Sequence, residues 1–188
     1  MHLYQNERVG LFIDGANLHA SLKHLDFDID YKKLLSFFRD NSQLVRAFYY
    51  TAIADDPEYS GIKPLIDWLA YNGYVLVSKQ AKEFVDGKGR KILKGNMDIE
   101  IAVDVLAMAG RLDHVVLFTG DGDFRVLVEA VQKAGCRVSA ISTSKSRPPM
   151  VADELRRQVD QFIELADLES EIGKSRQKNY KGKDYVDV

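Results

Sequence analysis

The sequence predicts an α/β fold, a three-layer α/β/α sandwich whose mainly parallel central sheet has helices on both faces. Short apolar runs of strand length alternate with segments whose apolar residues recur at helical spacing, which is the order of βα repeats. Helical crossovers of this kind join parallel strands and cover both faces of their sheet. The chain has 188 residues and is 46% hydrophobic, so it suits one globular domain with a sizeable core.

The N-terminal half alternates predicted strands and helices. Apolar runs predict strands at residues 9–14, 45–53 and 74–78, and helical spacing predicts helices at 16–25, 31–40 and 57–72. The helix at 57–72 has apolar residues at the i, i+3, i+4 and i+7 positions of a core-facing helix, and Asn72-Gly73 ends it. Tyr49 and Tyr50 are consecutive on a strand and point to opposite faces, so we expect one to pack inward and the other outward.

The C-terminal half repeats the alternation. The same criteria predict a helix, strand, helix and strand, followed by a short last strand, at residues 97–109, 114–119, 124–134, 136–142 and 162–165. Residues 1–173 therefore form the predicted domain. Residues 174–188, KSRQKNYKGKDYVDV, are polar and lack periodicity, so we expect a flexible C-terminal tail.

One segment interrupts this order. Residues 79–94, KQAKEFVDGKGRKILK, carry a turn signal at Asp86-Gly87 between short apolar patches, which predicts a protruding β-hairpin. The segment has six Lys or Arg residues against two acids. A basic arm of this kind is suited to contacting a phosphate backbone, so Arg90, Lys91 and Lys94 are candidate nucleic-acid contacts. The alternative is an ordinary solvated face.

Composition narrows the class of protein further. The formal charge is −2 and the pI is about 6.1, so any basic surface that binds nucleic acid must be local. Cys136 is the single cysteine, which excludes an intrachain disulfide and favours a reducing compartment. The N-terminus lacks a basic signal-peptide region, and no apolar stretch is long enough to span a membrane. These features predict a cytoplasmic protein without a membrane partner.

Carboxylates follow the predicted strands at positions where α/β sheets bind ligands. Ligands bind outside the carboxyl ends of such strands, and Asp14 and Asp121 both occupy that position. If the first and fourth strands are neighbours, as in the common order 3-2-1-4-5, these two side chains face a single crevice. Asp98 opens the helix directly after the basic hairpin, and Asp123 is a fourth candidate.

Four carboxylates in one crevice would repel one another and raise one another's pKa unless a cation lies among them. Oxygen-only ligands favour Mg²⁺ or Mn²⁺ over zinc, and either ion would support phosphodiester hydrolysis. Asp104 and Glu100 are turned away from the helix face that carries Asp98, so we expect no metal contact from them. The competing interpretation is that each acid is only a helix cap or turn former.

Three motifs stand out in the chain: FIDGANL at residues 12–18, KGNMD with a following AVD at 94–104, and TGDGDF at 119–124. Together they resemble the motifs of the NYN domains, a branch of the PIN-like ribonuclease superfamily, and in particular its bacterial LabA-like group. A closing ADELRRQVDQFIEL resembles the last helix and strand of that group, so the likeness runs from about Arg8 to Leu165. The segment between Lys94 and Asp98 is one residue longer than the form expected, which bears on the role of Lys94.

The resemblance implies a PIN-like, Rossmann-like sandwich that cleaves RNA with a metal-bound water and depends on Mg²⁺ or Mn²⁺. By position, the implied catalytic and metal-binding residues are Asp14, Asp98, Asp121 and Asp123. Asn17 and Thr119 would orient carboxylates or water. Lys94 and the loop STSKSR at 142–147, with Ser144 and Lys145, would contact phosphate.

Other functions fit less well. A dinucleotide enzyme needs G-x-G-x-x-G, and GDGDFR has Arg125 in place of the third glycine. No P-loop is present, and a phosphatase of the haloacid dehalogenase type needs a second aspartate where Ala16 stands. We therefore predict a metal-dependent endoribonuclease acting on RNA. The alternatives left open are a weakly active or inactive RNA-binding regulatory module on the same fold, and a homodimer of either.

Overall fold

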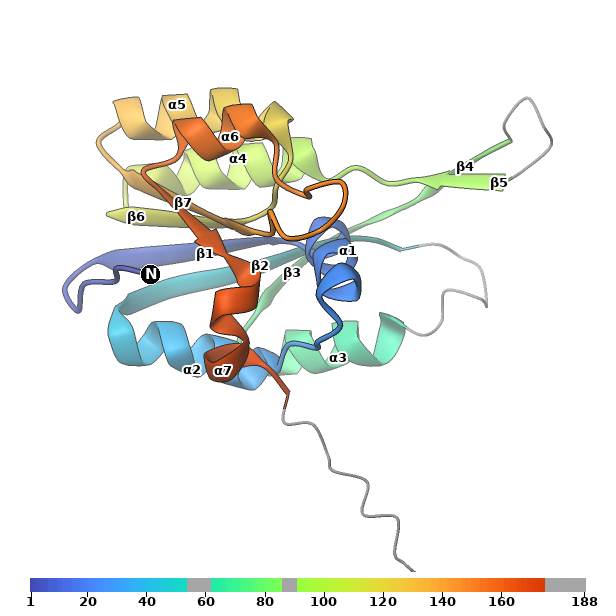
Figure 1. The fold of residues 1–188 in the computed structure, drawn as a ribbon, viewed down its shortest axis with the longest axis horizontal. Coiled ribbons are helices and arrows are strands. Elements are labelled where there is room, and N and C mark those ends of the chain that lie inside the picture. The colour runs from blue at the N-terminus through green and yellow to red at the C-terminus, as the bar shows by residue number, and fades with distance from the viewer. Residues whose placement is uncertain (54–61, 86–90, 175–188) are drawn as a thin grey trace, which may run out of the picture.

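A six-stranded, all-parallel sheet forms the centre of the protein (Figure 1). The computed structural model describes residues 1–53, 62–85 and 91–174, and over 82–85 and 91–94 it describes the backbone alone. The strands are β1 (Arg8–Asp14), β2 (Gln43–Ile53), β3 (Val75–Gln80), β6 (His114–Phe118), β7 (Arg137–Ser142) and β8 (Gln161–Glu164). Their order is β3-β2-β1-β6-β7-β8, so the first and fourth strands of the domain are neighbours, which is the condition under which Asp14 and Asp121 face one crevice.

Helices cover both faces of this sheet, which confirms the predicted three-layer sandwich (Figure 1). One layer contains α1 (Gly15–Leu25), α2 (Tyr31–Asn41), α3 (Lys63–Tyr71) and α7 (Glu169–Ile172). The other contains α4 (Asp98–Ala109), α5 (Arg125–Lys133) and α6 (Asp153–Gln158). Two 3₁₀ turns, η2 (Gly122–Phe124) and η3 (Leu165–Leu168), precede α5 and α7. No helix in the described part of the chain is both long and apolar enough to cross a bilayer.

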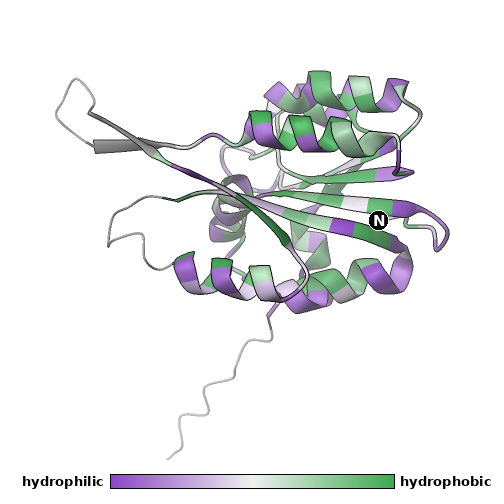
Figure 2. Ribbon diagram, turned by 180° about the vertical axis from the view of Figure 1, so that it is seen from behind, coloured by the Kyte–Doolittle hydropathy of each residue, from purple (hydrophilic) through white to green (hydrophobic). Residues whose placement is uncertain are grey.

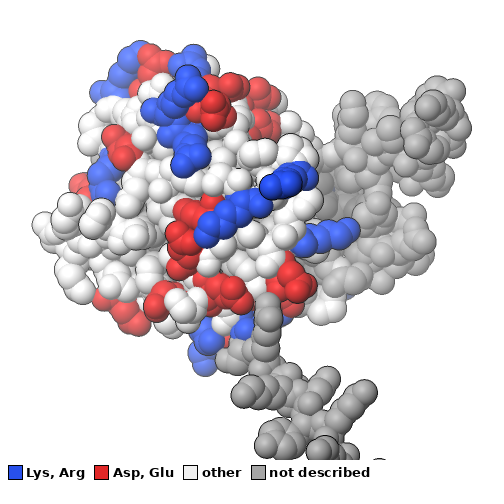
Figure 3. Space-filling view, viewed as in Figure 1, with Lys and Arg blue, Asp and Glu red and all other residues white. Residues whose placement is uncertain are grey.

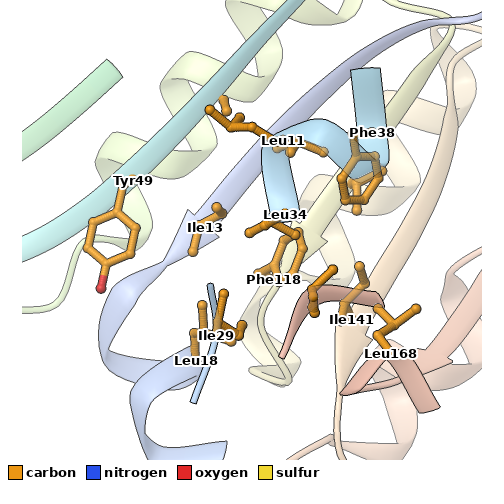
Figure 4. Packing of buried hydrophobic residues seen from close by; sticks show 14 of the residues in the cluster. Leu11, Ile13, Leu18, Ile29, Leu34, Phe38, Tyr49, Phe118, Ile141 and Leu168 are labelled. Atoms are coloured by element: carbon orange, nitrogen blue, oxygen red, sulfur yellow. The ribbon is translucent and has the colours of Figure 1, made fainter. Parts of the chain in front are cut away.

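Alternate residues of the central strands feed two separate cores. Leu11 and Ile13 of β1 pack with α1, α2 and α7, where Figure 4 shows them beside Leu34 and Phe118. Phe12, between them in sequence, packs into the other core with α4 and α5. Both helical layers present apolar residues to the sheet, as the hydropathy colouring in Figure 2 shows. This double burial explains why the strands are apolar without strict alternation.

The expectation that one of Tyr49 and Tyr50 would point outward was wrong. Both side chains are buried, Tyr49 in the core with α1 and α2 and Tyr50 in the core with α4. The two side chains do point to opposite faces, but neither face of this parallel sheet is open to solvent. Tyr50 meets the polar requirement of its buried hydroxyl by donating a hydrogen bond to Asp104 Oδ2 at 3.0 Å.

The predicted hairpin is present as a separate two-stranded sheet. β4 (Lys82–Val85) and β5 (Lys91–Lys94) are antiparallel, with Lys82 opposite Lys94, and Figure 1 shows them projecting from the sandwich. The turn predicted at Asp86-Gly87 lies outside the described residues, as do residues 54–61 and the expected tail from residue 175.

A buried polar network lies at the end of the sheet where β6 and β7 begin. His114 is fully buried, its Nε2 lies 2.8 Å from Ser139 Oγ, and its Nδ1 lies 3.1 Å from Arg137 Nη2. Arg137 in turn forms an ion pair with Glu7 at 2.7 Å. Since a guanidinium can only donate, Nδ1 accepts and the imidazole is neutral with its proton on Nε2. Burial, followed by the charge of Arg137, lowers the pKa of His114 to about 4.

This network makes folding stability depend on pH. Because unfolding restores the His114 pKa to about 6.5, the unfolded chain binds a proton between about pH 6.5 and 4 that the folded protein excludes. Stability is therefore lost as pH falls through this window, by about 2 kcal/mol between pH 7 and 5 from this group alone. Urea denaturation at several pH values should show a shallower decline for His114→Gln than for the unaltered chain. Equal slopes for His114→Gln and the unaltered chain would contradict the assignment.

Candidate metal centre

Three carboxylates converge at the carboxyl edge of the sheet. Asp121 follows the end of β6, Asp123 lies in the 3₁₀ turn η2, and Asp98 is the first residue of α4. One carboxylate oxygen from each of the three lies within 4.8 Å of the others. The neighbouring positions of β1 and β6 bring Asp14, at the end of β1, to the same edge. The four predicted acids therefore share one edge, but the tight group contains three of them.

Local hydrogen bonds hold the loop that carries Asp121 and Asp123. The Asp121 carboxylate caps η2 by accepting the backbone N–H of Asp123 at 3.0 Å. The backbone N–H of Asp121 donates to the hydroxyl of Thr119, which is buried. In this geometry Thr119 positions the Asp121 backbone rather than its carboxylate.

Asp98 has a partner that the sequence patterns did not identify. Asn96 donates from Nδ2 to Asp98 Oδ2 at 2.6 Å, and its Oδ1 accepts the backbone N–H of Asp98 at 2.7 Å. This reciprocal pair holds the carboxylate at the first turn of α4. The signal that could have found it is an asparagine two residues before a helix start, a position where its side chain commonly bonds the backbone.

Asp14 combines a structural and an electrostatic role. Its Oδ1 accepts the backbone N–H groups of Ala16 and Asn17, both at 3.1 Å, and so caps α1. Burial raises the pKa of Asp14, and the negative charges of Asp98 and Asp121 raise it further. Asp14 is therefore a helix cap that also lies within the field of the acid cluster. The capping interpretation is therefore confirmed for Asp14, whereas its role in metal binding stays a prediction.

Close backbone packing brings these segments together. Asn17 Oδ1 accepts the backbone N–H of Gly120 at 3.1 Å and so ties α1 to the loop after β6. A Cβ at Gly120 would collide with the Met150 carbonyl oxygen, and a Cβ at Gly15 would lie 2.7 Å from the Tyr50 carbonyl oxygen. Both glycines are required by proximity, since each allows an acidic turn to sit against a neighbouring chain segment.

The cluster lacks a balancing cation among the described residues. Burial raises the pKa of Asp98, and the charges of Asp121 and Asp123 add to this effect. Lys79 opposes it weakly, but its Nζ lies 2.9 Å from both carboxylate oxygens of Glu100 and is neutralised there. A donor set made only of carboxylate oxygens fits a hard divalent ion such as Mg²⁺ or Mn²⁺, whose charge would remove the repulsion.

The family comparison agrees with this geometry. The NYN domain model matches residues 8–169. The chain belongs to the NYN domain family. It is 32% identical over 176 residues to the low amplitude and bright protein LabA of Synechococcus elongatus, covering 92% of this chain and 91% of that protein. The fold is shared with a protein of unknown function from Vibrio parahaemolyticus, with a TM-score of 0.72, 22% identity, and coverage of 93% of this chain and 100% of that one.

This LabA-like NYN domain therefore has a PIN-like fold, and its three clustered aspartates fit a nuclease of that superfamily. Asp104 and Glu100 lie outside the cluster, as their helical positions led us to expect. Asp104 accepts the hydrogen bond from Tyr50, and Glu100 pairs with Lys79. Both therefore connect α4 to the strands of the sheet.

The predicted phosphate contacts of the NYN domain stay predictions. Ser144 donates from its backbone N–H and its hydroxyl to Glu164 Oε2, both at 2.9 Å, and Lys145 pairs with Asp167 at 2.7 Å. These contacts tie the loop after β7 to the segment around η3. The side chains of Lys91 and Lys94, and all of Arg90, lie outside the described residues. On the face seen in Figure 3, basic and acidic side chains are interspersed.

Metal binding should be detectable without any assay of activity. Binding to the folded state alone stabilises a protein by RT ln(1 + [L]/Kd), about 2.7 kcal/mol at a free Mn²⁺ concentration of 100 times Kd. We expect the melting temperature to rise with Mn²⁺, and Asp121→Asn to remove the rise while itself melting higher in EDTA because repulsion is relieved. Asparagine keeps the oxygen that caps η2, so the variant should fold. An unaltered Mn²⁺ response in Asp121→Asn would exclude this site.

Proposed function

We propose that this NYN domain is a divalent-metal-dependent endoribonuclease that hydrolyses RNA phosphodiester bonds at the carboxyl edge of its sheet. The observation that carries the proposal is the convergence of Asp98, Asp121 and Asp123 without a neutralising cation among the described residues. Membership of the PIN-like superfamily supports the choice of nuclease over other metal-dependent activities.

The side chains of the proposed site have two kinds of role, metal binding and positioning. Asp98, Asp121 and Asp123 would hold Mg²⁺ or Mn²⁺, with Asp14 as a fourth catalytic acid at the end of β1. When bound, the ion supplies a nucleophile from water at neutral pH and stabilises the charge that develops on the phosphate. Asn96, Asn17 and Thr119 act as positioning residues, since their hydrogen bonds fix Asp98, the Gly120 loop and the Asp121 backbone.

The basic hairpin supports a nucleic acid as the substrate. β5 ends at Lys94, four residues before Asp98, so the backbone of the arm leads directly into the cluster. Arg90, Lys91 and Lys94 would contact the phosphates of the strand on one side of the cleaved bond, and Ser144 and Lys145 those on the other. Engagement of Lys145 would require it to exchange Asp167 for a phosphate. Exposed surface pairs of this kind stabilise little, so the exchange costs little.

A regulatory RNA-binding module is the second candidate. The similar protein LabA is named for low amplitude and brightness, and that name states no catalytic activity. A module of this kind would keep the hairpin contacts and the fold, and its acid cluster would bind an ion without turnover. Cleavage assays separate the two candidates.

The double role of Asp14 allows a sharp test of the nuclease proposal. Asparagine caps helices about as well as aspartate, so Asp14→Asn should change stability by less than about 0.5 kcal/mol while removing a charge from the site. We expect Asp14→Asn and Asp121→Asn each to slow Mn²⁺-dependent cleavage of labelled single-stranded and structured RNA by about 100-fold. EDTA should abolish cleavage.

The matched control is Asp30→Asn. Asp30 caps α2 through the backbone N–H groups of Lys32 and Lys33, as Asp14 caps α1, but it is not part of the acid cluster. Its variant should cleave at the original rate. Cleavage that survives both Asp14→Asn and Asp121→Asn would reject the site, and tight RNA binding without cleavage by the unaltered protein would establish the regulatory module.

A further inference from the structure

The outer face of α4 is apolar where a surface helix is normally polar. Ile99, Val103 and Leu106 follow one another at i, i+4 and i+7 and are 75%, 59% and 52% exposed. The core-facing side of the same helix carries Ile101 and Val105, which are fully buried. A helix that is apolar on both sides is normally covered on both sides. Here the sheet covers one of them.

The adjacent helix α5 continues this surface. Val126, at its first turn, is 63% exposed. A groove of about 370 Å³ runs between the two helices beside Ile99, Leu106 and Val126, and its lining includes the small residues Ala102 and Ala130. We call Ile99, Val103, Leu106, Val126 and this groove the α4–α5 patch. The patch therefore has projecting aliphatic side chains next to a groove whose lining is mostly apolar.

The two ends of the α4–α5 patch carry opposite charge. Asp98 and Asp123 line the groove where both helices begin. At the other end, Arg111 follows α4, is exposed, and forms no side-chain ion pair within the residues the structure describes. Two such patches laid antiparallel would place the acidic end of each against the basic end of the other and would oppose their helix dipoles.

We propose that the α4–α5 patch is the interface of a two-fold symmetric homodimer. A two-fold interface joins the same surface of both copies and must therefore be complementary to itself. The patch meets this requirement in shape, with ridges beside a groove, and in charge, with opposite ends. Exposed apolar patches with a polar rim are typical of protein interfaces. Single-stranded nucleic acid, by contrast, is bound by aromatic and basic side chains, and the groove is lined by aliphatic side chains, two acids and the buried ring of Phe124.

The proposed dimer has a direct consequence for the acid clusters. Asp98 and Asp123 lie at the rim of the groove, so each cluster would lie at one end of the interface beside Arg111 of the second copy. The interface would thus close one side of each cluster and add a basic side chain near it. The dimer is independent of the proposed nuclease activity, because its evidence is the surface and charge of α4, α5 and the turns next to them and involves no catalytic step.

Sedimentation velocity across a concentration series of the full chain tests the proposal. We expect a monomer–dimer equilibrium, and we expect Val103→Glu with Leu106→Glu to raise the dissociation constant roughly 100-fold or more because charges would be buried. The matched control is Tyr71→Glu on α3, since Tyr71 is an aromatic side chain that is 90% exposed in the other helical layer. It should dimerise normally. A protein monomeric at every concentration, or a dimer unaffected by the double variant, would overturn the proposal.

Disulfide trapping tests the antiparallel arrangement and avoids any variant that introduces a charge. In an antiparallel pair centred between Ile99 and Leu106, the two copies of residue 103 face each other near the axis. The two copies of residue 99 lie about 10 Å apart along the helices, beyond the roughly 7 Å that a disulfide spans. Under mild oxidation Val103→Cys should form a covalent dimer, and Ile99→Cys alone should not. Cys136 is buried and serves as an internal control. Cross-linking of Ile99→Cys but not Val103→Cys would exclude the arrangement, and RNA protecting Val103→Cys in a monomeric protein would assign the patch to nucleic acid instead.

Discussion

Mutual repulsion among carboxylates at the carboxyl edge of the sheet is the constraint around which this protein is built. The strand order places β1 beside β6, so the acids that follow these strands share one edge. The helical acid Asp98 joins Asp121 and Asp123 within 4.8 Å. Burial and neighbouring charge raise the pKa of Asp98 and Asp14, so the folded protein carries an electrostatic cost at neutral pH. A divalent ion held by the three clustered aspartates would offset this cost.

The same side chains that create the repulsion also stabilise the turns that carry them. Asp14 caps α1 and Asp121 caps η2, so each charge sits where backbone N–H groups and the helix dipole favour it. Asn96 and Asn17 supply amide oxygens and N–H groups that hold the remaining segments. The same carboxylate oxygens cap the helices and repel one another. Substitution by asparagine keeps the capping oxygen and removes the charge, whereas substitution by alanine would remove both.

The two faces of α4 connect the cluster to the proposed assembly. The inner face packs in the core and receives the Tyr50 hydrogen bond at Asp104, which fixes the helix that presents Asp98. The outer face carries the α4–α5 patch, whose acidic end is the cluster itself. Association through this patch would therefore affect the acid cluster through α4, because that helix carries both the patch and Asp98.

The alternation of strands and helices, the hairpin and the four acids could be predicted from the sequence, because they depend on local periodicity and on residues next to strand ends. The neighbouring placement of the first and fourth strands was only a condition at the level of sequence, and the fold supplies it. Three other features could not be predicted and are seen in the folded chain alone. Tyr50 is buried against Asp104, Ser144 and Lys145 are held by Glu164 and Asp167, and three acids form the tight group. Those facts depend on contacts between segments far apart in the chain. The outer face of α4 is exposed because no other described element packs over it, which is also a property of the fold. Local sequence reports propensity and pattern, whereas the distance between two charges is set by the packing of the whole sandwich.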